Sequence, residues 1–360
     1  MGRFAQGPTD AVGQSRVIAG WRRLPMKMIL KVFKHTPELA LVTVLTVVGY
    51  AAVALFSDIA DTEVLRGGDV ILIVTASLLL STVIAIVAVI GGVGGGVIFT
   101  PVMLAFTSID TLVIRSTGLV VAMFSGLVSS RLFMRNGLAN IRLVYFGAVP
   151  IIIGAIGGSL LAVALADSLG EQGDALVRLL LGMILVCIAV MFVTGGAKTE
   201  FPEPKAAAGK LGLRGAYWEA SLGRTIAFQA THGVTGWFLL LAVGFTGGFF
   251  GLGGGWAVVP VFNLLMAIPM KVAAAASGVL LAIGNAAAIW PYIVAGALIP
   301  LFAAPWMLGQ VIGGIVGAHI LTGIKAGFVR QVLIVLMLLA SIRLLSRGVE
   351  GLFGVDIPVL

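Results

Sequence analysis

The sequence is poor in charge and in cysteine. Only 11% of its 360 residues are charged, whereas 59% are hydrophobic, and the mean hydropathy is +1.13. A soluble domain carries about 25% charged residues, so this composition excludes an ordinary soluble protein. Apolar stretches recur along the chain, and each is long enough to cross a bilayer. The single Cys187 excludes an intramolecular disulfide and is expected to be a small buried apolar residue.

Reactive side chains are scarce inside the apolar stretches. No Asp or Glu lies deep within an expected span, and no set of His, Cys and carboxylates has metal-ligand spacing. The glycine-rich stretches lack the Lys and Ser/Thr of a phosphate-binding loop. These absences argue against an enzyme, a cofactor, a metal site and a proton relay through carboxylates. The net charge of +8 comes without a nucleic-acid-binding motif, so no nucleic-acid partner is expected.

Glycine, by contrast, is abundant, and one glycine-rich stretch occurs twice. Residues 92–101 read GVGGGVIFTP and residues 251–260 read GLGGGWAVVP, 159 positions later. Each glycine weakens a helix by about 1 kcal/mol relative to alanine. In hydrocarbon, a broken backbone is tolerated only where protein or a water-filled cavity satisfies its polar groups. Two matching interruptions, one in each half, indicate the central site of a transporter; the alternative is that the glycines only allow close helix packing.

Further landmarks predict that the chain is duplicated. With one residue inserted after the proline, Thr117 would also match Ser277. At the same spacing of 159, Asn136-Gly137 falls opposite Ala295-Gly296, and the pair Gly154 and Gly158 falls opposite Gly313 and Gly317.

The expected fold is an all-α polytopic membrane protein with two inverted repeats of about five membrane segments each. Each repeat contains a short half-helix directly after its glycine break, and one extra transmembrane helix precedes the repeats. The basic N-terminal segment either lies on the membrane as an amphipathic helix or is a disordered tail. The predicted parts are a basic amphipathic cytoplasmic segment (1–37), an extra N-terminal span (38–56), a first repeat (70–194), a cytoplasmic linker (195–230), a second repeat (231–346) and a C-terminal tail (347–360).

Charge in the loops predicts the orientation. Basic residues at 131, 135 and 142 and five more in the linker are expected in the cytoplasm, and the acidic loop 167–174 outside. The equivalent loops of the second half have the opposite bias, which indicates inversion. That arrangement needs the short segment after each break to reach the far side; the alternative is a re-entrant segment. Arg343 and Arg347 would then lie outside, against the rule.

A small anion is the ligand that these breaks favour. A helix N-terminus presents unpaired N–H groups and about half a positive charge, which together bind anions. Neutral polar side chains downstream could add hydrogen bonds or could instead tie helices together, and Arg115 could attract the anion or extend to the surface. Gln310 is a weaker candidate. The predicted substrate-binding residues are Gly94, Gly95, Gly96, Arg115, Ser116, Thr117, Gly253, Gly254, Gly255, Asn263, Ser277 and Asn285.

These residues resemble the TauE/SafE family of sulfite and organosulfonate exporters, part of the sulfonate-uptake-permease superfamily. The resemblance rests on both glycine triplets with Pro101 and Pro260, on the downstream Ser116-Thr117 and Ser277, and on the Asn136-Gly137 turn, and it covers roughly residues 70–345. The chain departs from the family pattern where Arg115 precedes Ser116-Thr117 and where the second copy reads Ala-Ala-Ser-Gly.

The resemblance implies a secondary transporter of a small sulfur-containing anion in the cell inner membrane, with multiple spans and a cytoplasmic N-terminus. Further partners that we expect are the lipid bilayer, a coupling ion (H+ or Na+) and a second copy of the chain in a homodimer. Alternating access around a midplane site is the expected mechanism. An anion channel of the same fold is the alternative, and an intramembrane enzyme is a third reading.

Overall fold

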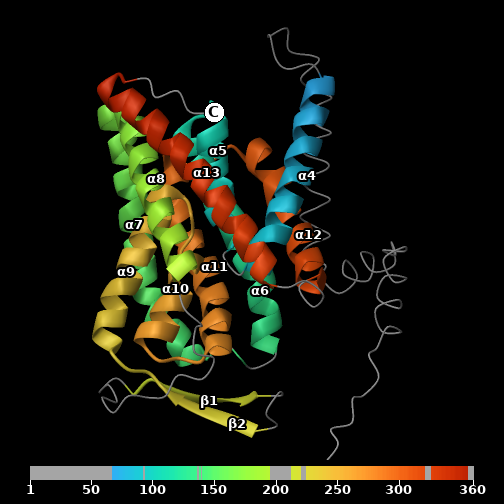
Figure 1. The fold of residues 1–360 in the computed structure, drawn as a ribbon, viewed down its shortest axis with the longest axis vertical. Coiled ribbons are helices and arrows are strands. Elements are labelled where there is room, and N and C mark those ends of the chain that lie inside the picture. The colour runs from blue at the N-terminus through green and yellow to red at the C-terminus, as the bar shows by residue number, and fades with distance from the viewer. Residues whose placement is uncertain are drawn as a thin grey trace, which may run out of the picture. The chain divides into compact units, whose positions relative to one another are not determined.

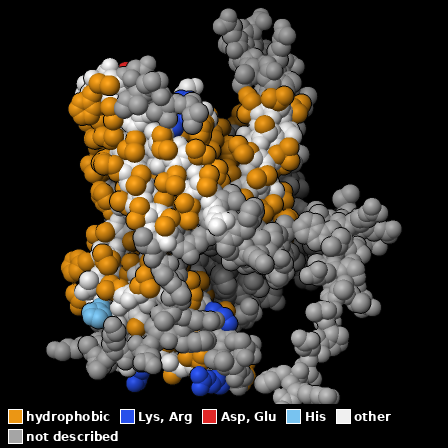
Figure 2. Space-filling view, in the orientation of Figure 1, with side chains coloured by type: hydrophobic (Ala, Val, Ile, Leu, Met, Phe, Trp, Pro, Cys, Tyr) orange, Lys and Arg blue, Asp and Glu red, His pale blue; other side chains and the backbone are white. Residues whose placement is uncertain are grey.

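The computed structural model describes residues 67–91, 94–135, 138, 140–194, 212–219, 224–320 and 326–355. Apart from Gly67, these belong to one of the two units into which the chain divides, Gly68–Leu360. The predicted N-terminal segment, the extra span and the Asn136-Gly137 turn lie outside the described residues. Hydrophobic side chains cover the outer faces of the helices, as a bilayer requires (Figure 2).

The described part of the chain is a bundle of helices with one small β-hairpin (Figure 1). Six helices are long and apolar enough to cross a membrane: α4, α6, α7, α8, α9 and α11. The first half contains α4 (Gly67–Gly91), α5 (Gly96–Phe106), α6 (Thr111–Arg135), α7 (Ile141–Leu169) and α8 (Glu171–Thr194). The second half contains α9 (Gly233–Phe250), α10 (Gly255–Pro260), the π-helical turn η1 (Val261–Leu265), α11 (Met270–Val294), α12 (Pro300–Ile320) and α13 (Ala326–Phe353).

The helix starts repeat at a constant spacing. The pairs α5 and α10, α6 and α11, and α7 and α12 each begin 159 residues apart. The loops 107–110 and 266–269 have equal lengths, so the insertion expected from the sequence is wrong. Ser277 is therefore equivalent to Gly118, and Thr117 is equivalent to Ala276.

The two halves exchange helices. The helix α7 packs on α9, and α12 packs on α4, so the fourth helix of each half lies on the first helix of the other. A β-carbon on Gly154 would overlap the carbonyl oxygen of Leu241, and one on Gly313 would overlap that of Thr82. Since Thr82 and Leu241 are themselves 159 residues apart, equivalent residues make equivalent contacts, as in a two-fold arrangement. These two glycines allow close helix packing, the simpler of the two readings.

Equivalent helices at the centre run antiparallel. Ser116, near the start of α6, donates a hydrogen bond to the Ala297 carbonyl just after α11, at 3.0 Å. About three turns further along α6, Gly126 faces the carbonyl of Gly278, which lies in the first half of α11. The pair α8 and α13 is antiparallel too, because Gly182 adjoins Leu345 while Gly351 adjoins Ala175.

A β-hairpin that the sequence did not predict lies at one end of the bundle. Strands β1 (Arg214–Glu219) and β2 (Arg224–Gln229) are antiparallel, and the buried Tyr217 and Phe228 anchor them on the helices. Gly215 contacts Asn140, whose side chain accepts from two amides at the start of α7. The linker that carries the hairpin and the loop before α7 therefore lie at the same end of the bundle.

Basic side chains lie at both ends of the bundle: Arg343 and Arg347 donate to the carbonyls of Ala105 and Thr107, near the acidic loop, as the sequence predicted against the rule. The exposed Arg142, Arg214 and Arg224 lie at the hairpin end, where Figure 2 shows blue side chains. At the other end α8 begins with the exposed Glu171, and Asp174 accepts a hydrogen bond from Thr111 at the start of α6.

Two smaller expectations are wrong. The helix α13 continues to Phe353, so residues 347–353 are not part of a tail. Cys187 is exposed on α8 rather than buried, because it lies on the outer face of a helix in an apolar bundle, where hydrophobicity does not indicate burial.

Candidate functional site

Both glycine triplets interrupt the helices, and they do so in the same way. We call Gly94 and Gly95, the described residues directly before α5, the first break and residues 251–254, between α9 and α10, the second break. Gly94 has φ +86° and the equivalent Gly253 has φ +70°. Glycine adopts this left-handed conformation without a steric penalty. The two halves therefore share one backbone form at the interruption.

Each break is the tip of a helical hairpin. The amide of Thr231, just before α9, donates to the carbonyl of Met266, just after η1, at 3.0 Å. The helix α9 thus starts where the returning segment α10–η1 ends. In the first half, α4 lies parallel to α12, and α12 starts beside the beginning of α6. The helix α5 also ends near that point, because only four residues separate it from α6. The short segments consequently run from the interior back to the end at which the preceding helix starts (Figure 1). They are therefore re-entrant, and the expectation that they reach the far side is wrong. Three long helices follow the hairpin in each half, an odd number, so inversion does not require the short segments to cross.

The two breaks adjoin between α6 and α11. The Ala122 methyl carbon would lie 2.8 Å from a β-carbon on Gly96 and 2.8 Å from one on Gly253. Its equivalent, Leu281, is the neighbour of Gly94 and of Gly253. The first turns of the two short helices, α5 and α10, therefore lie close together in the core.

Both short helices start without a side-chain cap. The helix α5 has Gly95 as N-cap, and α10 has Gly254, and neither residue has a side chain that could cap the amides that follow it. The helix α10 continues through η1 as one apolar helix, Gly255–Leu265. The first amides of a helix have no intrahelical acceptor and carry a partial positive charge. Two such ends consequently point into the region where the breaks meet.

Buried polar atoms without a partner gather on the same elements. Three are donors, and burying a donor without an acceptor costs about 1–3 kcal/mol. A bound anion would accept from them. On α6, α10, α11 and α12 the atoms are Thr117 Oγ1, Trp256 Nε1, Asn285 Nδ2, Trp306 Nε1 and Gln310 Oε1, while Arg178 Nε on α8 is another such atom away from the breaks.

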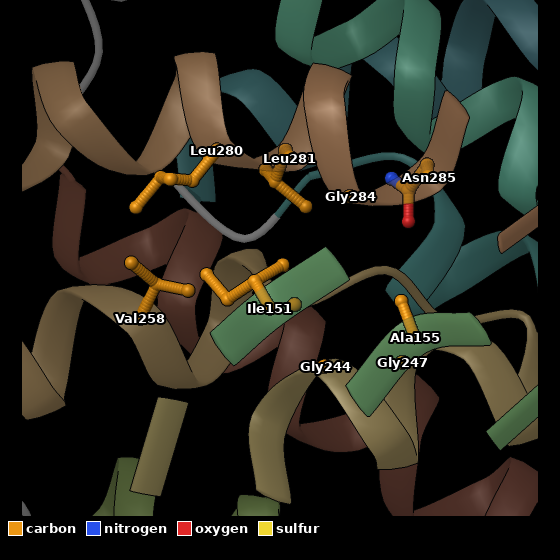
Figure 3. Close-up of a pocket in the computed structure, with 10 residues that line it drawn as sticks. Ile151, Ala155, Gly244, Gly247, Val258, Leu280, Leu281, Gly284 and Asn285 are labelled. Atoms are coloured by element: carbon orange, nitrogen blue, oxygen red, sulfur yellow. The ribbon is translucent and has the colours of Figure 1, made fainter. Parts of the chain in front are cut away.

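A small pocket lies at the second break. In Figure 3, Leu281 and Asn285 of α11 point across a gap toward Val258 of α10 and Ile151 and Ala155 of α7. The pocket leaves about 10 Å³ for the centre of a water molecule, which is about what one water needs. A sulfite-sized anion therefore requires the surrounding helices to separate. The lining residues are Ile151, Ala155, Gly244, Gly247, Gly254, Val258, Leu280, Leu281, Gly284 and Asn285.

Arg115 does not extend to the surface. Its side chain is only 1% exposed, and it donates to the carbonyls of Thr111 at 3.3 Å and Phe249 at 3.1 Å. Its guanidinium carbon also lies 5.8 Å from the Phe249 ring centroid. Because Phe249 belongs to the last turn of α9, the cation meets the negative end of that helix. The described contacts of Arg115 are thus structural.

Two more predicted residues tie the backbone together. Ser116 Oγ bonds to the Ala297 and Val113 carbonyls, and Asn263 Nδ2 donates to the Ile268 carbonyl at 2.9 Å. Asn263 lies in η1, toward the hairpin end and away from the second break. The structure therefore does not bring these side chains to the pocket.

The remaining predicted residues lie around the breaks. Gly95, Gly96, Gly253 and Gly255 are buried in the region where the breaks meet. Ser277 is buried one turn before Leu281 on α11, and Thr117 is buried on α6. Of all predicted residues, only Gly254 and Asn285 line the pocket.

Several other residues of the site were not predicted from the sequence. Gly244, Gly247 and Gly284 line the pocket as backbone surface, and Ser125 Oγ accepts from the Gly95 amide at 3.4 Å. Glycines at helical spacing are a weak signal because most glycines in membrane helices serve packing.

Comparison with known proteins covers both breaks. The family model described as "Sulfite exporter TauE/SafE" matches residues 77–344. The chain is 26% identical over 265 residues to "Probable membrane transporter protein YunE" of Bacillus subtilis (strain 168). The matched region covers 72% of this chain and 92% of that relative. No solved structure matches the chain.

Proposed function

The chain belongs to the TauE/SafE sulfite exporter family, and from this premise we propose that it is a secondary transporter that exports a small sulfur-containing anion, such as sulfite or an organosulfonate. The related protein of Bacillus subtilis is named a probable membrane transporter, in accord with a transport role rather than an enzymatic one.

One observation carries this proposal: two uncapped helix N-termini meet inside the bundle, beside buried donors without acceptors. A small anion that leaves water needs several donors at once. Backbone amides and the side chains of Trp256, Asn285 and Trp306 supply neutral donors, while the buried Arg115 is engaged by the Thr111 and Phe249 carbonyls. Such a set holds the anion without the strong attraction that would prevent its release.

The antiparallel pairing of equivalent helices supports inverted repeats. Since α6 and α11 are equivalent and run in opposite directions, a two-fold axis that relates them lies across the bundle. For helices that span a bilayer, such an axis lies in the membrane plane. The two hairpins then approach the centre from opposite sides, and rocking of the bundle would open one side at a time.

The charge distribution supports an orientation. The end with Arg142, Arg214 and Arg224 faces the cytoplasm of an inner membrane, by the positive-inside rule. The end with Asp167, Glu171 and Asp174 faces outside.

Flux through proteoliposomes tests the proposal. Vesicles loaded with sulfite should release it faster than protein-free vesicles, and external sulfite should accelerate the release by exchange. Counter-exchange is the property of a carrier, whereas a channel of the same fold would conduct current without it. Release at the protein-free rate, for sulfite and for small sulfonates alike, would contradict the proposed function.

A further inference from the structure

A chain of hydrogen bonds fixes the orientation of the Gln310 side chain. Ser81 Oγ donates its single proton to the Trp306 carbonyl. Gln310 Nε2 lies 3.3 Å from the Ser81 carbonyl and 3.3 Å from Ser81 Oγ. The carbonyl can only accept, so the nitrogen of the amide must face Ser81. The oxygen of Gln310 is therefore the atom on the opposite side.

This oxygen lies at the start of α5 without a partner. Gln310 is 1% exposed, and its Oε1 has no hydrogen bond. A β-carbon on Gly95 would overlap Oε1 first of all neighbouring atoms, so the oxygen is directed at the N-cap of α5. Beside it, among the described residues, a β-carbon on Gly94 would find only Leu281 within 4 Å, at 3.8 Å.

The two breaks differ in chemistry at equivalent positions. Gln310 corresponds to Ile151, which lines the apolar pocket at the second break. The two serines near the first break, Ser81 and Ser125, correspond to Leu240 and Gly284. The polar side chains of Gln310, Ser81 and Ser125 therefore have no polar counterparts at the second break. Because the second half folds in the same way without them, the shared fold does not explain their presence.

From these contacts we infer that the first break binds the protonated form of an oxyanion, of which hydrogen sulfite is the sulfur example, and that Gln310 Oε1 accepts the hydrogen bond from its proton. The N-terminus of α5 favours negative charge, whereas a buried carbonyl oxygen requires a donor. A monoanion that keeps one proton supplies both. This inference rests on the proposed function and specifies which form of the anion is carried.

A metal cation fits the first break less well. It would satisfy Oε1, but it would lie against the positive end of α5. A dianion would meet the amides but would place negative charge against Oε1. Only a ligand with one donor and a net negative charge matches both groups.

The pH dependence should come from the ligand. The helices around Gln310 are α4, α5, α6 and α12, and no charged or titratable residue lies within one turn of Ser81, Gly95, Ser125 or Gln310 along them. The charge of Arg115 is directed at the last turn of α9. The charged or titratable residues of these four helices are Asp69, Arg115, Arg131, Arg135 and His319.

Binding to the purified full-length protein tests the inference. Sulfite changes between its singly and doubly charged forms near neutral pH, whereas methanesulfonate has no proton to lose there. The apparent affinity for total sulfite should fall about tenfold per pH unit above the second pKa of sulfite, while the affinity for methanesulfonate stays constant. Sulfite affinity that is constant or rises with pH would overturn the inference.

The variant Gln310→Met removes the acceptor at nearly constant volume. Sulfite affinity below its second pKa should fall about tenfold, as for one lost hydrogen bond, with less than twofold change for methanesulfonate. Equal losses for both anions, or none for sulfite, would overturn the assignment of Gln310. Ser159→Ala is the matched control, because Ser159 is buried and bonds only within α7.

Three further results separate this inference from the proposed function. If Gln310→Met does not fold, the wild-type pH profile decides the protonation state alone. If wild-type protein binds neither anion at any pH, the proposed function fails together with this inference. If it binds sulfite only as the dianion, the proposed function stands and this inference fails.

Discussion

Thr100, in the short helix of the first half, donates a hydrogen bond of 2.7 Å to the carbonyl of Gly251, which opens the second break. The two residues are 151 positions apart and both are buried. The bond fixes the end of α9 against α5 and so joins the two breaks directly. Any movement that separates the hairpins must break it.

Replacing Thr100 with valine should therefore affect both stability and transport. The variant keeps the shape but leaves the Gly251 carbonyl without its donor, at a cost of about 1–3 kcal/mol. We expect a lower midpoint of thermal unfolding in detergent and altered sulfite flux. Thr246→Val is the control, because Thr246 Oγ1 bonds only within α9; an equal effect of both variants would contradict a special role for Thr100.

A large side chain at Gly254 should abolish transport while the protein remains inserted. A β-carbon there would lie 3.0 Å from Val243 and 3.6 Å from Val258, so the rest of a leucine side chain must occupy the pocket. We expect Gly254→Leu to express in the membrane and to lose sulfite flux. The control is Gly157→Leu, since a β-carbon on Gly157 meets nothing within 4 Å. Normal flux through Gly254→Leu would remove the pocket from the transport path.

Alanine at Gly96 should destabilise the fold. Its β-carbon would lie 2.7 Å from the Leu252 carbonyl oxygen and 2.8 Å from Ala122, so backbone at the second break must shift. Overpacking of this kind costs about 1–3 kcal/mol. Thermal unfolding should show the loss, whereas the control Gly157→Ala should leave the unfolding midpoint unchanged, because a β-carbon on Gly157 meets nothing within 4 Å. A Gly96→Ala protein as stable as wild type would mean that the breaks are less tightly apposed.

Removal of the charge at Arg115 should reduce stability without a selective loss of anion affinity. Arg115→Met removes the guanidinium donors to the Thr111 and Phe249 carbonyls and leaves Phe249 with only the Tyr292 hydroxyl among its described side-chain donors. It also removes a buried cation from the negative end of α9, and truncating such a buried group is costly. We expect a lower unfolding midpoint but unchanged sulfite affinity in the folded fraction. Arg142→Met, at an exposed position, should leave stability unchanged. A large loss of affinity at normal stability would return Arg115 to the binding site.

The sequence predicted most helices because hydrophobic runs and glycine interruptions are local features. The short helices α5 and α10 directly follow the two glycine breaks, as expected, and α6 and α7 lie within the predicted first repeat, 70–194. Predictions failed where contacts between segments that are distant in the sequence determine whether a residue is buried or how the two halves align. The burial of Arg115 depends on the end of α9, which lies 134 residues away. The extra residue placed after Pro101 came from matching hydroxyl groups, whereas the helix starts set the alignment.

The β-hairpin and the composition of the pocket were missed for a similar reason. Strands of six residues in a polar linker give little alternation to detect, and Tyr217 and Phe228 become buried only on the assembled helices. Four of the residues that line the pocket come from α7 and α9, whose proximity results from the exchange of helices between the halves.

That exchange has a consequence for the origin of the chain. Because α7 covers α9 and α12 covers α4, one half alone would lack the partner for its first helix and for its fourth. An ancestor with a single copy could bury those surfaces only as a symmetric pair of identical subunits, each lending a helix to the other. Gene fusion would then have preserved an existing dimer within one polypeptide, leaving the second copy free to lose the polar side chains that only the first break uses.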